Sequence, residues 1–155
     1  MRRAQRLLAA LSCAALALVP CCACARGASA PSAALDGPAI SLSVDGAEVP
    51  VVWEDNQTVT ALCALLEEGE LLVHTRRYGG FEQVGALATG LPSDDVTVTT
   101  APGDIALYAG DQIVLFYGAN TWEYTMLGRI DGLSDAELAA LLGGTSAELV
   151  LRIVE

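Results

Sequence analysis

Apolar and polar residues alternate along most of the chain from residue 39 onward, with the period of two that half-buried β-strands require. Ile40, Leu42 and Val44 occupy alternate positions, Asp45-Gly46 is a typical tight turn, and 49–53 is predicted to be the returning strand of a hairpin. Further strands are predicted at 71–78, 96–100, 105–109, 113–117, 124–131 and 149–154. Short strands that are separated by turns at regular intervals are typical of a sandwich or barrel. The pattern therefore predicts a mainly β fold of about seven or eight strands.

Two short segments have helical spacing instead. The first follows Asn56 and carries apolar residues three and four positions apart until Gly69. The second begins at the capping box Ser134-Asp135-Ala136-Glu137 and ends at Gly143-Gly144. We therefore expect two short helices beside the strands.

Three further segments lead to expectations about connectivity. The run 110–132 consists of two apolar strands joined by a polar turn with aromatic residues, and we expect it to be the central hairpin of the barrel. The segment 149–154 is almost continuously apolar, which predicts a closing strand paired on both sides. The segment 81–91 follows Gly79-Gly80 without a clear period, and we expect a crossing loop there.

The first 25 residues are predicted to be an export signal. Arg2, Arg3 and Arg6 form a basic start, and an apolar run follows at 7–19. Such a segment is not part of the fold. We expect an extracytoplasmic protein that is either membrane-anchored as a lipoprotein or secreted.

The end of this signal allows more than one kind of processing. Ala23-Cys24-Ala25 fits the small-residue pattern of ordinary secretion, whereas a cysteine directly after the apolar run is typical of a lipoprotein acceptor. The acceptor is Cys24 or Cys21, and an uncleaved anchor is the remaining alternative. In each membrane-bound case, the contact with the membrane is made by the N-terminal anchor alone.

Composition divides the rest of the chain into a tether and one domain. Residues 26–38 are rich in Ala, Ser and Pro and are predicted to be a flexible tether, and residues 39–155 are expected to form a single domain. Loss of the signal leaves five arginines and no lysine against 19 acidic residues, a net charge of −14. So acidic a domain would repel nucleic acid and anionic membranes, so we expect neither as a partner.

Cysteine and histidine are too few to build a metal site. Four of the five cysteines lie in the signal, and Cys63 stands among apolar helix positions, where we expect it to be a buried hydrophobe. His74 is the only histidine, and we expect it to form a structural hydrogen bond rather than to act in catalysis. We predict no metal, no cofactor and no catalytic residue.

Aromatic and hydrogen-bonding residues suggest a groove. We expect the Gly79–Glu82 segment to meet the turn of the opening hairpin and to form aromatic walls with a few polar groups, the usual composition of a site for a small molecule or peptide. The same residues also fit an alternative in which rings merely close the barrel end and Glu82 pairs with Arg129 or Arg76. The candidate ligand-binding residues are Arg76, Tyr78, Phe81, Glu82, Tyr117, Asn120, Trp122 and Tyr124.

Several of these segments resemble, in order, those of the bacterial cyclophilin-like fold proteins. The motifs are Asp55-Asn56 before a helix, 78–85, Leu91-Pro92, 102–105 with Leu107-Tyr108, Asn120-Thr121-Trp122, Tyr124-Thr125 and 127–130. The resemblance covers residues 39–154 and implies a small cyclophilin-like β-barrel with reduced loops. His74-Thr75-Arg76 is similar to the cyclophilin His-Arg strand, but the Gln-Gly-Gly-Asp segment that should follow is absent. The resemblance therefore does not imply prolyl isomerase activity.

Three functions follow as hypotheses. The first is an exported, tethered domain that binds a small molecule or peptide in the aromatic groove without catalysis. The second is a peptidyl-prolyl isomerase-like enzyme with Arg76 aimed at the prolyl carbonyl. The third is a protein-interaction or structural domain of the cell envelope.

Overall fold

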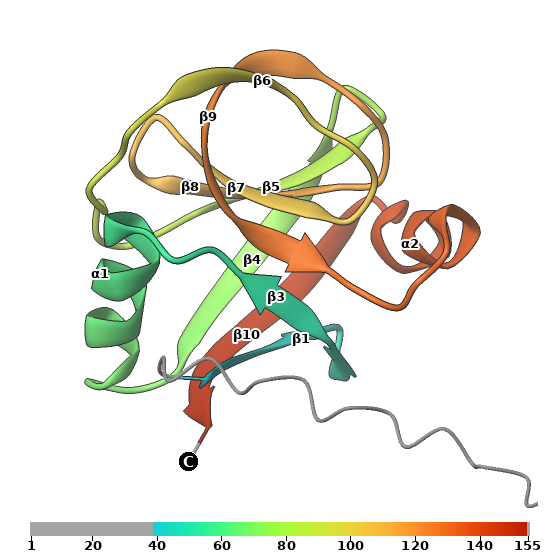
Figure 1. Cartoon of the computed structure of the whole chain (residues 1–155). Helices are drawn as coiled ribbons and strands as arrows, with labels where there is room; N and C mark the ends of the chain where they lie inside the picture. The colour runs from blue at the N-terminus through green and yellow to red at the C-terminus, as the bar shows by residue number, and fades with distance from the viewer. Residues whose placement is uncertain (1–38, 155) are drawn as a thin grey trace, which may run out of the picture. The chain divides into compact units, whose positions relative to one another are not determined.

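A computed structural model of the chain describes residues 39–154, so the predicted signal and tether lie outside the described residues. Ten strands and two helices make up this part (Figure 1). The elements are β1 (Ala39–Val44), β2 (Ala47–Val49), β3 (Val51–Trp53), α1 (Gln57–Leu66), β4 (Leu71–Tyr78), β5 (Glu82–Ala86), β6 (Val96–Thr99), β7 (Asp104–Tyr108), β8 (Gln112–Phe116), β9 (Thr121–Ile130), α2 (Asp135–Leu142) and β10 (Ser146–Val154).

Nine strands form one antiparallel sheet that curls into a nearly closed barrel. Their order is β2-β1-β10-β4-β5-β8-β7-β9-β3, and β6 pairs with β9 outside this path. At the seam of the barrel, the Trp53 indole N–H of the end strand β3 donates a hydrogen bond of 2.8 Å to the Ile40 carbonyl of β1. The predicted mainly β barrel with two short helices is confirmed.

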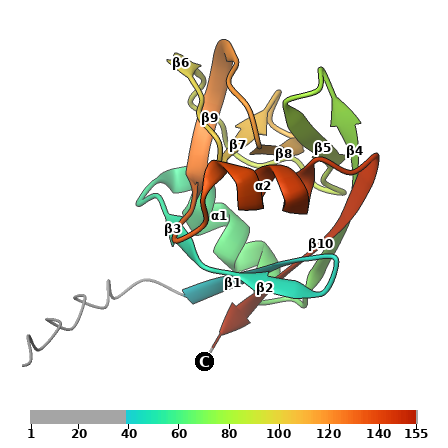
Figure 2. The ribbon, with the colours of Figure 1, turned by 90° about the vertical axis from the view of Figure 1, so that its right-hand side faces the viewer.

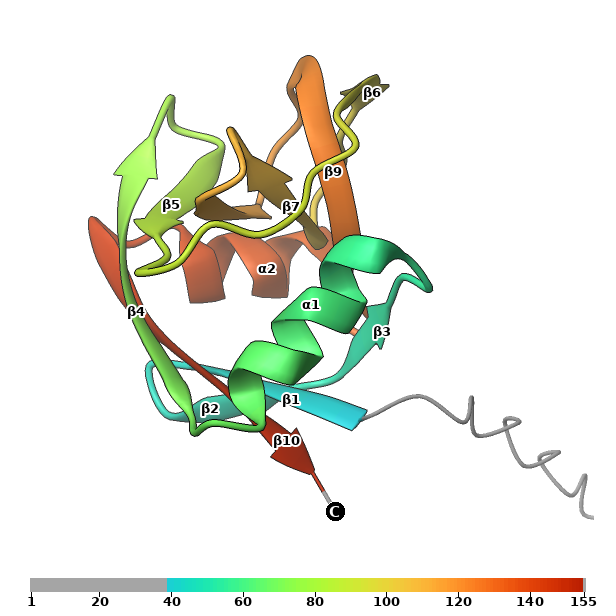
Figure 3. The ribbon, with the colours of Figure 1, turned by 90° about the vertical axis from the view of Figure 1, so that its left-hand side faces the viewer.

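The two helices lie at opposite ends of the barrel, as the views from its two sides show (Figures 2 and 3). Asn56 caps α1 by accepting a hydrogen bond from the Val59 N–H, and its own amide donates to the Met126 carbonyl of β9. At α2, Ser134 and Glu137 form the capping box that the sequence predicts. Each helix turns apolar residues towards the barrel interior.

The main core fills the barrel interior. It contains the inward residues of β1, β4 and β10 together with the buried faces of both helices, and Cys63 of α1 is buried within it as predicted. Strand β10 pairs with β1 on one side and β4 on the other, which confirms the prediction of a closing strand paired on both sides.

A second, smaller core lies on the outer face of β5, β8 and β7. It consists of Ala106, Val114, Phe116 and Tyr124. Because strand residues point alternately to opposite faces, Ile113 and Leu115 of β8 enter the main core while Val114 and Phe116 enter the second. This burial on both faces explains why β8 is apolar from Ile113 to Phe116.

Strand count and pairing differ from the expectations at three places. Pro50 divides the predicted strand 49–53 into β2 and β3, which pair with different neighbours. The predicted crossing loop at 81–91 is wrong because β5 occupies 82–86. The predicted central hairpin is also wrong: β7 lies between β8 and β9, so these two strands do not pair with each other.

Candidate functional site

A pocket of about 530 Å³ lies against the second core. The β4–β5 turn rises on one side of the β7–β8 hairpin, and β9 with β6 rises on the other (Figures 2 and 3). We call this site the aromatic pocket. Its lining residues are Tyr78, Phe81, Glu82, Val84, Tyr108, Gln112, Val114, Asn120, Trp122 and Tyr124.

Glycines shape the β4–β5 side of the pocket. Gly79 has φ +59°, and a Cβ atom on it would lie 2.2 Å from the Phe81 ring. A larger residue at 79 would therefore displace Phe81, which packs against the second core. The chain turns sharply after Tyr78, and the effect of this turn is to place Phe81 and Glu82 together on the pocket wall.

Glu82 belongs to the pocket because of its register in β5. It pairs with Phe116 of β8, and Val84 follows it on the same face of the strand. Gln83 points the other way, and its amide donates to the carbonyls of Leu142 and Gly144 at 2.7 and 2.9 Å. Glu82 and Gln83 thus point to opposite faces of β5, and both hydrogens of the Gln83 amide have an acceptor.

The Glu82 carboxyl is in an unusual environment. Its side chain is only 4% exposed, and its buried Oε2 atom has no hydrogen-bond partner in the described part of the chain. Burial disfavours the charged form and raises the pKa of Glu82 to about 7, while the Tyr124 hydroxyl partly offsets this rise. Glu82 therefore changes charge near neutral pH.

Tyr124 is held in place beside this carboxyl. Its ring makes edge-to-face contacts with Tyr108 and Phe116, with centroid distances of 5.9 and 5.3 Å. The Asn120 amide donates a hydrogen bond of 2.9 Å to the Tyr124 hydroxyl, which leaves the phenolic proton free for another acceptor. Burial is the largest cause that raises the pKa of Tyr124, so it stays a neutral donor at physiological pH.

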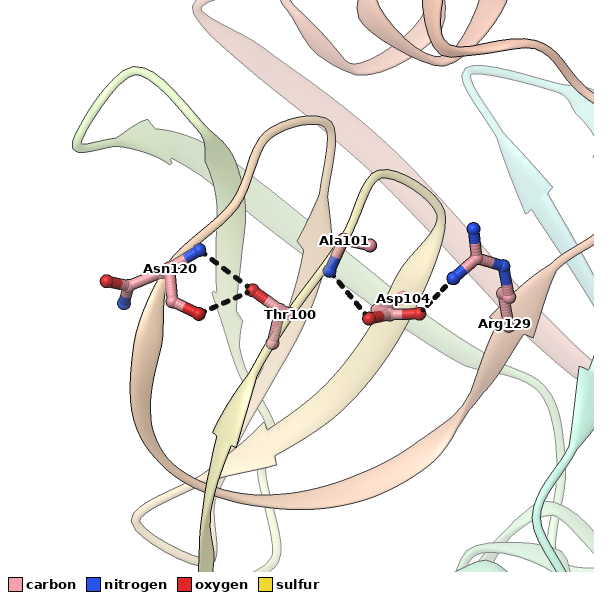
Figure 4. A network of polar contacts seen from close by, with 5 residues as sticks. All are labelled: Thr100, Ala101, Asp104, Asn120 and Arg129. Atoms are coloured by element: carbon pink, nitrogen blue, oxygen red, sulfur yellow. Dashed lines mark hydrogen bonds and ion pairs between the residues drawn. The ribbon is translucent and has the colours of Figure 1, made fainter.

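The backbone of Asn120 is fixed by Thr100. The Thr100 hydroxyl accepts from the Asn120 N–H and donates to its carbonyl, both at 3.1 Å, and the Asn120 side chain points away from Thr100 (Figure 4). Nearby, Asp104 accepts from the Ala101 N–H at 2.7 Å and pairs with Arg129 at 2.8 Å. The bonds of Thr100 anchor the start of β9 and so position the pocket amide, whereas the Asp104–Arg129 pair holds the end of β9.

Six of the eight residues predicted for the groove line the aromatic pocket, namely Tyr78, Phe81, Glu82, Asn120, Trp122 and Tyr124. Arg76 and Tyr117 are not among the lining residues. Arg76 is exposed on β4, and Tyr117 packs against the main core. That the six bind a ligand stays a prediction.

Sequence reasoning missed four lining residues and the partners of the Gly79–Glu82 segment. Val84, Tyr108, Gln112 and Val114 complete the wall, and none of the lining residues comes from the opening hairpin. Tyr108 pairs directly with Gln112 across two strands, and Val84 pairs in the same way with Val114. The place of these four residues in the wall can therefore be inferred only once the strand order is known.

Other charged groups lie outside the pocket. Arg129 pairs with Asp104, and no ion pair among residues 39–154 involves Glu82, so the predicted alternative in which Glu82 pairs with Arg129 or Arg76 is wrong. His74 lies 3.8 Å from Glu148 on the exposed face of β4 and β10.

Within residues 39–154, no cluster of three or more His, Cys, Asp or Glu side chains could hold a metal ion. Neither helix in the same part of the chain is long and apolar enough to cross a membrane.

These features define a small β-barrel domain with a helix at each end and an aromatic pocket on the outer face of its wall. The model of the cyclophilin-like family matches residues 42–154, and the chain belongs to this family. The resemblance stated from the sequence motifs is thereby confirmed. A search of curated proteins found no match.

Proposed function

We propose that this chain is an exported, membrane-tethered binding domain whose aromatic pocket takes a small molecule or a short peptide segment. The observation that carries the proposal is a pocket of about 530 Å³ with aromatic walls and a few polar groups. Pockets of this size and composition are typical of small-ligand sites. Export and tethering rest on the basic and apolar N-terminal pattern with its following cysteines.

Trp122 provides a direct test of binding because it lines the pocket and is 56% exposed. A library of small molecules and short peptides is screened by thermal stabilisation, and each hit is titrated while tryptophan fluorescence is measured. We expect hits to raise the melting temperature and to change the Trp122 emission, because a bound ligand removes solvent from the ring.

Trp122→Phe is the matched control, since Trp53 remains at the barrel seam in that variant. The emission change should disappear in Trp122→Phe while the variant stays folded. A folded wild-type protein that no library member stabilises, or an emission change that survives in Trp122→Phe, would count against a ligand site at this pocket.

Prolyl isomerisation receives less support. Arg76, the residue predicted to face a prolyl carbonyl, is exposed on β4 and does not line the pocket. We expect a coupled assay with proline peptides to give a rate equal to the uncatalysed background, since the pocket offers no arginine to the peptide bond. A rate above background that Arg76→Ala abolishes would favour the enzyme hypothesis instead.

A further inference from the structure

We infer that the ligand of the aromatic pocket is a small organic cation, an amine or quaternary ammonium compound, whose charge lies against Glu82 and between the surrounding rings. This inference rests on the proposed binding function and adds the chemical class of the ligand. It is argued from the Glu82 carboxyl, the ring lining and the absence of cationic side chains from the lining residues.

The first observation is a buried acid in the pocket wall without a cationic partner. Glu82 lines the pocket, is 4% exposed, and keeps its Oε2 atom unpartnered. Neither of the two ion pairs found among residues 39–154 involves it. A buried carboxylate is costly unless a positive charge or hydrogen-bond donors compensate it, and Tyr124 supplies only one donor. A cationic ligand would supply the missing compensation.

The second observation is the set of rings around this acid. Tyr78, Phe81, Tyr108, Trp122 and Tyr124 all line the same pocket. The faces of aromatic rings attract cations, most strongly when the cation has lost water, and aromatic walls are used to recognise ammonium groups. Tyr78 and Trp122 are exposed at the pocket, so a ligand can reach the buried acid between them.

The charge of the lining residues disfavours anionic ligands. Among the ten lining residues none is Arg, Lys or His, and Glu82 is the only carboxylic acid. The whole chain carries a net charge of −11. An anionic ligand would meet repulsion from both, whereas a cation is attracted into the pocket.

Other titratable groups near Glu82 do not change this picture around neutral pH. They are Tyr78 at the end of β4, Tyr108 on β7 and Tyr124 on β9, and none of them is a carboxylic acid or a basic group. Strand β8 contributes Gln112, Val114 and Phe116, which do not titrate. The affinity for a cation should therefore follow the ionisation of Glu82 alone.

A matched set of compounds tests the ligand class. The probes are phenethylamine, phenylethanol and phenylacetate, which share one ring skeleton, together with benzyltrimethylammonium, and binding is measured by NMR titration. We expect the two cations to bind at least about tenfold more tightly than the alcohol, with the carboxylate weakest. Because an alkylamine stays protonated near neutral pH, as a lysine does, its affinity should be about tenfold lower at about pH 6 than at about pH 8.

Two variants show whether the acid is responsible. Glu82→Gln keeps the size of the side chain, and it should lower the affinity for both cations at least about tenfold and remove the pH dependence. Glu123→Gln on β9 removes the same charge from an exposed position and should leave both unchanged. Chemical-shift dispersion of each variant establishes that it is folded.

The outcomes separate the two proposals. If the alcohol binds as tightly as the amine, or if Glu82→Gln binds the cations like the wild type, the cation inference is overturned while pocket binding stands. The same holds if a library screen finds a pocket ligand but no cation binds. If neither the screen nor the four probes give binding, both proposals fail.

Discussion

Replacing Glu82 by glutamine should stabilise the protein, increasingly so as the pH rises from about 4.5 to about 7. The pKa of Glu82 rises from the ordinary value of 4.5 to about 7 through burial. At about 1.4 kcal/mol per pH unit, this rise makes ionisation of Glu82 cost about 3 kcal/mol more in the folded than in the unfolded protein. Glutamine has the same size and never ionises, so it avoids that cost.

The sign of the pH dependence follows from proton binding. Between about pH 4.5 and about pH 7 the folded protein holds a proton on Glu82 that the unfolded chain has released, so its stability falls as the pH rises through this window. Below about pH 4.5 the Glu82 carboxyl is neutral in both the folded and the unfolded protein, so the cost of ionising it vanishes. The variant should therefore exceed the wild type by about 3 kcal/mol near pH 8, and this excess should disappear near pH 4.5.

Urea unfolding followed by circular dichroism at several pH values measures this difference directly. For a domain of this size, about 3 kcal/mol corresponds to a melting temperature higher by roughly 10 °C at the alkaline end. Glu123→Gln is the control and should follow the wild type within about 0.5 kcal/mol throughout, because Glu123 is exposed. Parallel stability profiles for Glu82→Gln and wild type would refute the raised pKa.

Three further predictions concern the barrel and the N-terminus. Gly128→Ala should destabilise the protein by at least about 2 kcal/mol in urea unfolding, because the added Cβ would lie 2.6 Å from the Val52 carbonyl, while Gly90→Ala, with its nearest atom at 3.6 Å, should be close to neutral. Trp53→Phe should cost about 1 to 3 kcal/mol, since it removes the hydrogen bond to the Ile40 carbonyl at the seam, and an unchanged unfolding midpoint would contradict this role. Intact-mass measurement of protein extracted from membranes should show a lipid on the cysteine that follows the signal, and a mass equal to the unprocessed chain would contradict lipidation.

Local chemistry made much of the fold predictable. The alternation in 40–44 and the Asp45-Gly46 turn correspond to β1, a two-residue turn and β2, with Val44 paired to Ala47. The capping box at Ser134 marks the start of α2 because it satisfies backbone donors within one turn of chain. A tight turn and a capping box each depend only on residues that are close in sequence, so the sequence alone is enough to predict them.

Strand β5 and the order of the strands could not be predicted in this way. Strand β5 buries Glu82 and Gln83, so its pattern of burial does not coincide with a pattern of apolar residues. The pairing of β8 with β5 and of β9 with β7 joins segments that are not adjacent along the chain, and periodicity says nothing about such pairings. Six pocket residues were found because they are aromatic or polar beside predicted turns, whereas Val84 and Val114 resemble ordinary core residues.

Strand β5, which the sequence pattern did not predict, also forms part of the pocket wall. A polar residue buried in a strand lowers stability unless it has partners, and Gln83 has them at the carbonyls beside α2 whereas Glu82 has an unpartnered oxygen. A structural explanation therefore accounts for Gln83 but leaves Glu82 with a cost in stability that grows above about pH 4.5 and is complete above about pH 7. A cation in the pocket would remove that cost as it binds, so the same ligand should stabilise the protein more at alkaline than at acidic pH.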